Sequence, residues 1–272
     1  MRWFNLLRHP TTPYGFRMLT PTQIAQFHQD GFLLLRQRVT PIQCARLRSV
    51  AEQQLRDAVP PLEYEAEVGY AGAPAARHAV GGDTVRRLRG AWARDACFQE
   101  WAADPSLAAE LAQLFGEPVV LNLAHHNCVM TKHPAWSTAT GWHRDIRYWS
   151  FSDSNLITVW LALGDENVDN GGLQLIPASH NWQVDPTQLD ERDFLRPELA
   201  RNAELVAQAV ALSLHQGDVL LFHSSLFHAA GKNQSGERKL SVAFAYHGRR
   251  TRPLPGSRSA VAGEVDVTVA ND

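Results

Sequence analysis

The chain has 272 residues, of which 44% are hydrophobic and 20% charged, so it holds enough apolar material for a packed core and is not of disordered composition. Its net charge of −2 lacks the basic excess of a nucleic-acid-binding protein, which excludes nucleic acid as an expected partner. Three scattered cysteines, Cys44, Cys97 and Cys128, argue against a disulfide framework and a thiolate zinc site. Because the sequence also lacks a leader-like or membrane-spanning apolar run, we expect a cytoplasmic protein with no membrane partner.

The N-terminal part, about 19–116, is predicted to be mostly helical. Thr-Pro pairs beginning at Thr20 and Thr40 each supply an N-cap and a first-turn proline, and a glutamine three residues after each threonine completes a capping box. Asp104 and Pro105 start a third helix in the same way. The expected elements are a helix ending near Gly31, a short strand at 32–36, helices over about 41–57 and 105–115, and a long loop at 60–83.

From Pro118 onward, short apolar runs alternate with Gly, Pro, Asn and Asp, which predicts an all-β core. Residues 181–208 are polar, acidic and longer than a hairpin loop, so we expect them to form a mobile cover over a site. We therefore expect one domain over 1–248, with its β core at about 118–248, and a weakly ordered C-terminal tail at 249–272. The predicted core strands are 119–121, 156–163, 173–176, 219–222 and 240–246.

Two His-x-Asp triplets occur, one starting at His28 and the other at His143. Residues two apart diverge on a helix but share one face of a strand, so only the triplet in the β-rich region can direct both side chains to one ion. Two histidines and a carboxylate that leave open positions are typical of non-haem Fe(II) oxygenases, so a second histidine must come from elsewhere. The sequence spacing alone leaves five candidates open: His180, His215, His223, His228 and His247.

The order and spacing of several short motifs resembles the phytanoyl-CoA dioxygenase-like branch of the Fe(II)/2-oxoglutarate-dependent oxygenases. The resemblance covers about 19–246 and implies a mainly β fold with flanking helices around a double-stranded β-helix, or jelly-roll, core of the cupin kind. The motifs are Gly141-Trp142-His143-Arg144-Asp145, the run 160–163, Asn170-Gly171-Gly172-Leu173, Ile176-Pro177-Ala178-Ser179-His180, Gly217-Asp218-Val219, Phe222-His223, His228, Asn233 and Arg238.

The resemblance implies a hydroxylase that uses Fe(II), 2-oxoglutarate and O2 to oxidise a C–H bond of a small molecule, with release of succinate and CO2. It assigns His143, Asp145 and His228 as metal ligands, and Arg238, Trp160 and Cys128 to the 2-oxoglutarate pocket. Some members have a serine where this chain has Ala230, and Asp145 argues against the related halogenase chemistry. Arginines beside His143 favour a polar or anionic substrate. The oligomeric state is left open.

Two other classes of function are compatible with parts of the pattern. A cupin-type metalloprotein that does not use 2-oxoglutarate would share the β architecture and some histidines, but it would leave Arg238 and the turn at Asn233 without a role. A non-catalytic binding or sensor protein on the same fold would be expected to lack one of the three metal ligands. Since all three are present in the sequence, the enzyme is the favoured reading.

Overall fold

The computed structural model describes residues 17–268, so the first residues of the predicted domain and the last four of the tail lie outside the described part. The α-helices are α1 (Pro21–Asp30), α2 (Pro41–Arg56), α3 (Ala96–Ala102), α4 (Pro105–Phe115), α5 (Ala200–Val206) and α6 (Arg258–Val261). The strands are β1 (Phe32–Leu35), β2 (Leu62–Tyr64), β3 (Val85–Arg89), β4 (Val119–Asn122), β5 (Cys128–Lys132), β6 (Thr140–His143), β7 (Leu156–Ala162), β8 (Leu173–Leu175), β9 (Val210–Ala211), β10 (Val219–His223), β11 (His228–Ala230), β12 (Lys239–Gly248) and β13 (Glu264–Asp266).

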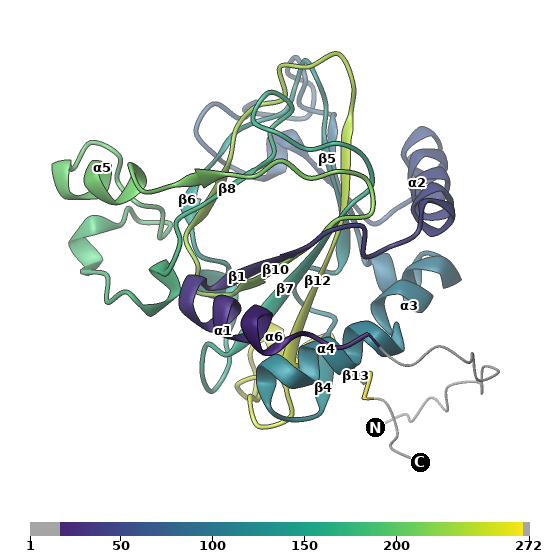
Figure 1. The fold of residues 1–272 in the computed structure, drawn as a ribbon. Helices are drawn as coiled ribbons and strands as arrows, with labels where there is room; N and C mark the ends of the chain where they lie inside the picture. Colours follow the sequence, from purple (N-terminus) through teal and green to yellow (C-terminus); the bar gives the residue numbers. More distant parts are fainter. Residues whose placement is uncertain (1–16, 269–272) are drawn as a thin grey trace.

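The strands form two antiparallel sheets, which agrees with the predicted mainly β core. The larger sheet has nine strands, with the order β1-β10-β7-β12-β5-β3-β2 and with β4 and β13 joined at the side of β12. The smaller sheet has four strands in the order β6-β11-β8-β9. Figure 1 shows helices α2, α3 and α4 near the larger sheet and α5 at the far side of the molecule, beyond β6 and β8.

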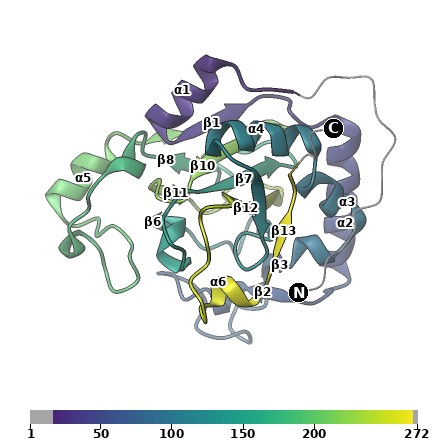
Figure 2. The ribbon, with the colours of Figure 1, turned by 90° about the horizontal axis from the view of Figure 1, so that it is seen from below.

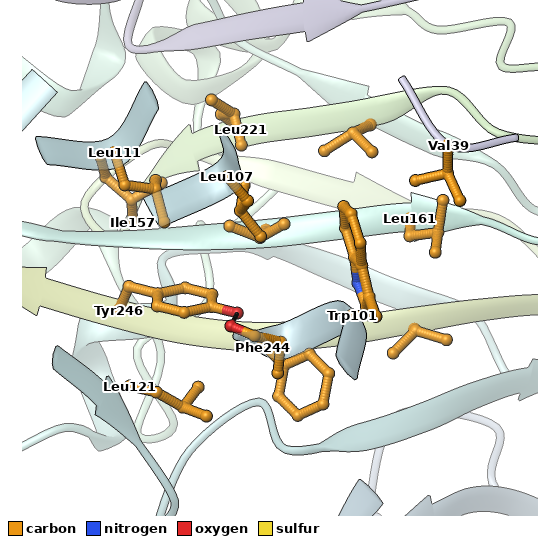
Figure 3. Packing of buried hydrophobic residues seen from close by; sticks show 14 of the residues in the cluster. Val39, Trp101, Leu107, Leu111, Leu121, Ile157, Leu161, Leu221, Phe244 and Tyr246 are labelled. Atoms are coloured by element: carbon orange, nitrogen blue, oxygen red, sulfur yellow. Dashed lines mark hydrogen bonds between the residues drawn. The ribbon is translucent and has the colours of Figure 1, made fainter. Parts of the chain in front are cut away.

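The outer face of the larger sheet is apolar and packs against the N-terminal helices. Along β7 and β12, alternate residues such as Ile157, Leu161 and Phe244 are fully or almost fully buried on this face, as the period of two in a strand requires. Trp101 and Leu111 of the helices pack against them (Figure 3). Because this packing on the outer face stabilises the larger sheet, its inner face can carry the polar residues of a site.

The predicted helix starts and the two early helices are confirmed. Thr20 and Thr40 each cap their helix and form a capping box with the glutamine three residues on. Gly31, which ends α1, has φ 78, a left-handed conformation that glycine adopts without steric cost. The chain then turns directly into β1, which pairs with β10.

Three parts of the chain differ from the sequence-based expectation. The loop expected at 60–83 begins with β2, and α3 lies ahead of α4 where no helix was predicted. The C-terminal residues 249–268, which we call the C-terminal arm, contain the short helix α6, which was not predicted, and the strand β13. Strand β13 pairs with β4, so the arm is part of the larger sheet. No helix among residues 17–268 is long and apolar enough to cross a membrane.

Candidate active site

Three predicted ligand residues meet between the two sheets. His143 ends β6 and His228 begins β11, and the two lie opposite each other in the antiparallel pair. Asp145 follows β6 and starts a 3-10 turn, so it is not on the strand itself as the triplet pattern suggested. Its Oδ1 lies 3.9 Å from His143 Nε2 and 3.6 Å from His228 Nε2. Two atoms bound to one ion at about 2.1 Å lie at most about 4.2 Å apart, so these distances fit a shared metal ion.

Hydrogen bonds fix both imidazoles with Nε2 facing the centre. The Nδ1 of His143 donates to the carbonyl of Gly141 at 2.8 Å, and the Nδ1 of His228 donates to that of Leu226 at 3.0 Å. Burial lowers the pKa of both histidines, so their neutral, metal-binding form is favoured at neutral pH. Burial alone would raise the pKa of Asp145, but the neighbouring His126 and His228 hold it well below its usual range. The residues present therefore suit a divalent cation such as Fe(II).

His126 is a site residue that the sequence reasoning missed. Its Nε2 lies 2.9 Å from Asp145 Oδ2, and Thr158 of β7 donates its hydroxyl hydrogen to the same oxygen, also at 2.9 Å. Asp145 raises the pKa of His126 to about 10 although burial acts in the opposite direction. These contacts occupy Oδ2 and leave Oδ1 facing the histidines. His126 lies just before β5 with φ 34, and no spacing pattern links it to residue 145.

Replacing His126 by alanine is expected to weaken metal binding about 10- to 100-fold, the range for losing a group that orients a ligand. Asp145 would keep only the Thr158 hydroxyl on Oδ2 and could rotate. Titration of the apoprotein with Mn(II) measures the effect. Thr158→Val, which removes the other bond to Oδ2 with little change in volume, should give a loss of the same kind. Wild-type affinity in both variants would contradict the orienting role.

The other four candidate histidines are not part of the metal centre. His180 and His223 pack against each other with ring centroids 5.3 Å apart. His215 is exposed beside Asp165, and His247 bonds to Glu264. Within residues 17–268, the group able to hold a metal ion comprises only His143, Asp145 and His228. The first His-x-Asp pair, His28 and Asp30, is on α1 as expected and does not converge.

A cavity of about 410 Å³ opens from the three ligands along the inner face of the larger sheet. Two of the three predicted pocket residues, Trp160 of β7 and Cys128 of β5, are buried and line it. The Trp160 indole N–H donates to Glu166 at 3.2 Å. Ala230, which departs from the pattern of the resembled family, also lines the cavity and leaves it without a hydroxyl at that point.

Arg238 does not lie where its expected role requires. It is exposed, precedes β12 and does not line the cavity. The next residue, Lys239, is only 5% exposed and does line it, because neighbouring residues of a strand point to opposite faces. Its Nζ lies 3.0 Å from Glu166 Oε2 and 4.9 Å from the centroid of the Trp160 ring. The cation that faces the cavity is therefore Lys239, one residue after Arg238. We correct the assignment of Arg238 to the 2-oxoglutarate pocket and give that role to Lys239.

A second lysine lies at the same end of the cavity. Lys132 of β5 is paired in register with Lys239 of β12 and is also buried. Its ammonium donates to the backbone carbonyls of Thr138, Ala230 and Gly231 rather than to a carboxylate. Burial, helped by Arg86 and Lys239, lowers the pKa of Lys132 to about 6. A ligand carboxylate at this end would favour the charged form, since opposite charges stabilise each other.

The segment 181–208 packs beside the metal centre through apolar residues. Phe194 lies 5.6 Å from the His143 ring, centroid to centroid, and Leu195 is buried. The Leu195 amide donates to the carbonyl of Trp142 at 2.9 Å. Arg147 stacks on Phe194, with 3.7 Å from its Cζ to the ring centroid. The segment therefore buries more apolar surface than its polar composition indicated, and its role as a mobile cover stays a prediction.

Comparison with known proteins gives the family and the fold. The family model described as phytanoyl-CoA dioxygenase (PhyH) matches residues 27–240. Ectoine dioxygenase of Bordetella bronchiseptica is 24% identical over 245 residues, covering 84% of this chain and 75% of that protein. The crystal structure of EctD from S. alaskensis with 2-oxoglutarate and 5-hydroxyectoine matches with TM-score 0.71 and 20% identity, covering 93% of this chain and 87% of that one. The α-ketoglutarate-dependent epimerase SnoN matches with TM-score 0.68 and 22% identity, covering 86% and 82%.

These matches confirm the expected fold and agree with the donor set found between the sheets. Another EctD structure in the comparison holds bound Fe, on the same fold and with TM-score 0.70. In this chain, His143, Asp145 and His228 supply the donors that such an ion needs. The family match spans all three of these residues, together with Trp160 and Lys239. The chain therefore belongs to the phytanoyl-CoA dioxygenase family of non-haem iron and 2-oxoglutarate-dependent oxygenases.

Proposed function

We propose that the protein hydroxylates a C–H bond of a small molecule, using Fe(II), 2-oxoglutarate and O2 and releasing succinate and CO2. The observation that supports this most directly is the convergence of His143, Asp145 and His228 at a cavity with a buried cation, Lys239, in its wall. When bound, iron and 2-oxoglutarate would supply the oxidising chemistry. The protein would supply the ligands, a fixed orientation and a space that excludes bulk water.

The cosubstrate end of the cavity is assigned to Lys239, with Trp160 and Cys128 as walls. Lys239 is paired with Glu166, and Lys132 lies opposite it. The Lys239 ammonium is held in the cavity wall by Glu166, where it could also donate to one carboxylate of 2-oxoglutarate. The Glu166 carboxylate accepts hydrogen bonds from the Ser241 hydroxyl at 2.5 Å and from the Trp160 indole. These bonds fix the carboxylate that positions the Lys239 ammonium.

The substrate is proposed to be a polar small molecule, as expected from the sequence, because charged residues such as Glu63, Arg87 and Arg89 line the cavity. The arginines beside His143 do not contribute to this. Arg144 and Arg147 do not line the cavity; Arg144 lies over Phe227 and Arg147 over Phe194. The cytoplasmic location stays a prediction from the sequence. A cupin-type protein that does not use 2-oxoglutarate is the alternative, and Lys239 is the residue that argues against it.

The proposal can be tested without knowing the primary substrate. Oxygenases of this kind convert 2-oxoglutarate to succinate slowly even when no primary substrate is present. Anaerobically prepared protein is supplied with Fe(II) and 2-oxoglutarate and exposed to O2, and succinate is measured over time. We expect formation of succinate by the wild type and none above background by Asp145→Ala. Binding of 2-oxoglutarate to Mn(II)-loaded protein is measured alongside by calorimetry. Absence of both succinate and 2-oxoglutarate binding would favour the cupin alternative.

A further inference from the structure

The cavity that contains the metal ligands is also lined by residues of β3 and of the C-terminal arm. Arg89, the last residue of β3, and Arg258, the first residue of α6, both line it. Figure 2 shows the arm in yellow, with α6 between the end of β12 and β13. The family match ends at residue 240, so the arm lies outside the part of the chain that defines the family.

A buried serine holds the arm in place. Ser259 is 1% exposed, and its hydroxyl lies 2.7 Å from His125 Nε2 and accepts from the backbone N–H of Ser150 at 2.9 Å. The side-chain amide of Asn122 donates to the Ser259 carbonyl at 3.3 Å. Since Arg258 is the neighbour of this anchored residue, its backbone has a fixed position at the cavity wall.

Several charges that line the cavity have a partner of opposite charge. Lys239 pairs with Glu166 at 3.0 Å, whereas Lys132 donates only to backbone carbonyls and the Glu67 carboxylate accepts a backbone N–H. Two arginines of β3 also have partners, namely Arg86 with Glu65 at 3.0 Å and Arg87 with Glu63 at 2.5 Å. By contrast, Arg89 and Arg258 are exposed, and no carboxylate of residues 17–268 lies within 4.0 Å of either guanidinium.

We propose that Arg89 and Arg258 form a subsite for an anionic group, a carboxylate or a phosphate, of the primary substrate. This inference rests on the proposed function and names the class of its substrate. A guanidinium offers a planar pair of N–H donors that matches either anion. Tyr148 and Trp149 line the same cavity and provide aromatic surface for the remainder of the molecule. The substrate would thus be held by its anion at Arg89 and Arg258, with a C–H bond directed at the metal.

Aromatic probes that differ only in the charged group test the subsite. Protein saturated with Mn(II) and 2-oxoglutarate is titrated by calorimetry with benzoate, phenyl phosphate and neutral benzamide. We expect at least one anionic probe to bind ten times more tightly than benzamide. Arg89→Gln and Arg258→Gln should each lose about tenfold in affinity for that anion and keep their affinity for benzamide, Mn(II) and 2-oxoglutarate. The preferred anion distinguishes a carboxylate from a phosphate substrate.

Arg252→Gln is the matched control, because Arg252 is exposed on the same arm and does not line the cavity. It should bind the probes as the wild type does. The subsite is refuted if neither anion is preferred to benzamide, or if the two cavity variants retain wild-type preference. Wild-type protein that fails to bind Mn(II) and 2-oxoglutarate would instead contradict the proposed function. The preliminary titrations with those two ligands therefore separate the two failures.

Discussion

His228→Ala is expected to abolish tight binding of Fe(II) and of substitutes such as Mn(II). The variant removes one of three ligand atoms, and the remaining pair, His143 and Asp145, leaves the ion largely hydrated. The loss should exceed the 100-fold that marks the upper range for removing a supporting group. His143→Ala and Asp145→Ala should behave alike. Calorimetry with Mn(II) under anaerobic conditions measures all three variants on the same scale.

His223→Ala is the matched control for this experiment. His223 ends β10 only five residues before His228, but its ring packs against His180 at 5.3 Å, and it is neither in the group that can hold a metal ion nor in the cavity wall. The variant should keep wild-type metal affinity. Should His223→Ala lose the metal while His228→Ala retains it, the distal ligand would be misassigned. Comparing the thermal stability of the apoproteins shows that any loss is not caused by unfolding.

Local chemistry is what made most of the fold predictable. Capping residues at Thr20 and Thr40 set helix starts by hydrogen bonds within four residues, so the sequence records them directly. Core strands such as β7 are buried along their whole length and therefore appear as continuous apolar runs. The edge strand β2 has three partly buried residues and no such run, so it was read as part of a loop.

The site was predictable where a motif defines it and not where it depends on register. His143 and Asp145 stand in one triplet, and His228 could be singled out only through a family resemblance. The inward orientation of Lys239 rather than Arg238 follows from strand alternation, and an error of one residue reverses it. His126 and Arg258 reach the cavity through tertiary packing alone, which no spacing in the sequence encodes.

Replacing Lys239 is expected to weaken the binding of 2-oxoglutarate strongly. Lys239→Met alone would leave Glu166 buried and unpaired, and such a change commonly costs about 3–5 kcal/mol of stability. The double variant Lys239→Met/Glu166→Gln avoids that uncompensated charge. It should bind 2-oxoglutarate more weakly by about 1.5–3 kcal/mol, the range for hydrogen bonds to charged groups, or roughly 10- to 150-fold. Mn(II) affinity should be unchanged, since neither residue is a metal ligand.

Two single variants make the test of Lys239 specific. Arg238→Ala removes the neighbouring charge, which is exposed and outside the cavity, so 2-oxoglutarate should bind with wild-type affinity. Glu166→Gln keeps Lys239 but removes the carboxylate that competes for its ammonium, so 2-oxoglutarate should bind at least as tightly as in the wild type. Calorimetry on Mn(II)-loaded protein measures both. Loss of affinity in Arg238→Ala, with none in the double variant, would return the role to Arg238 and require β12 to be shifted by one residue.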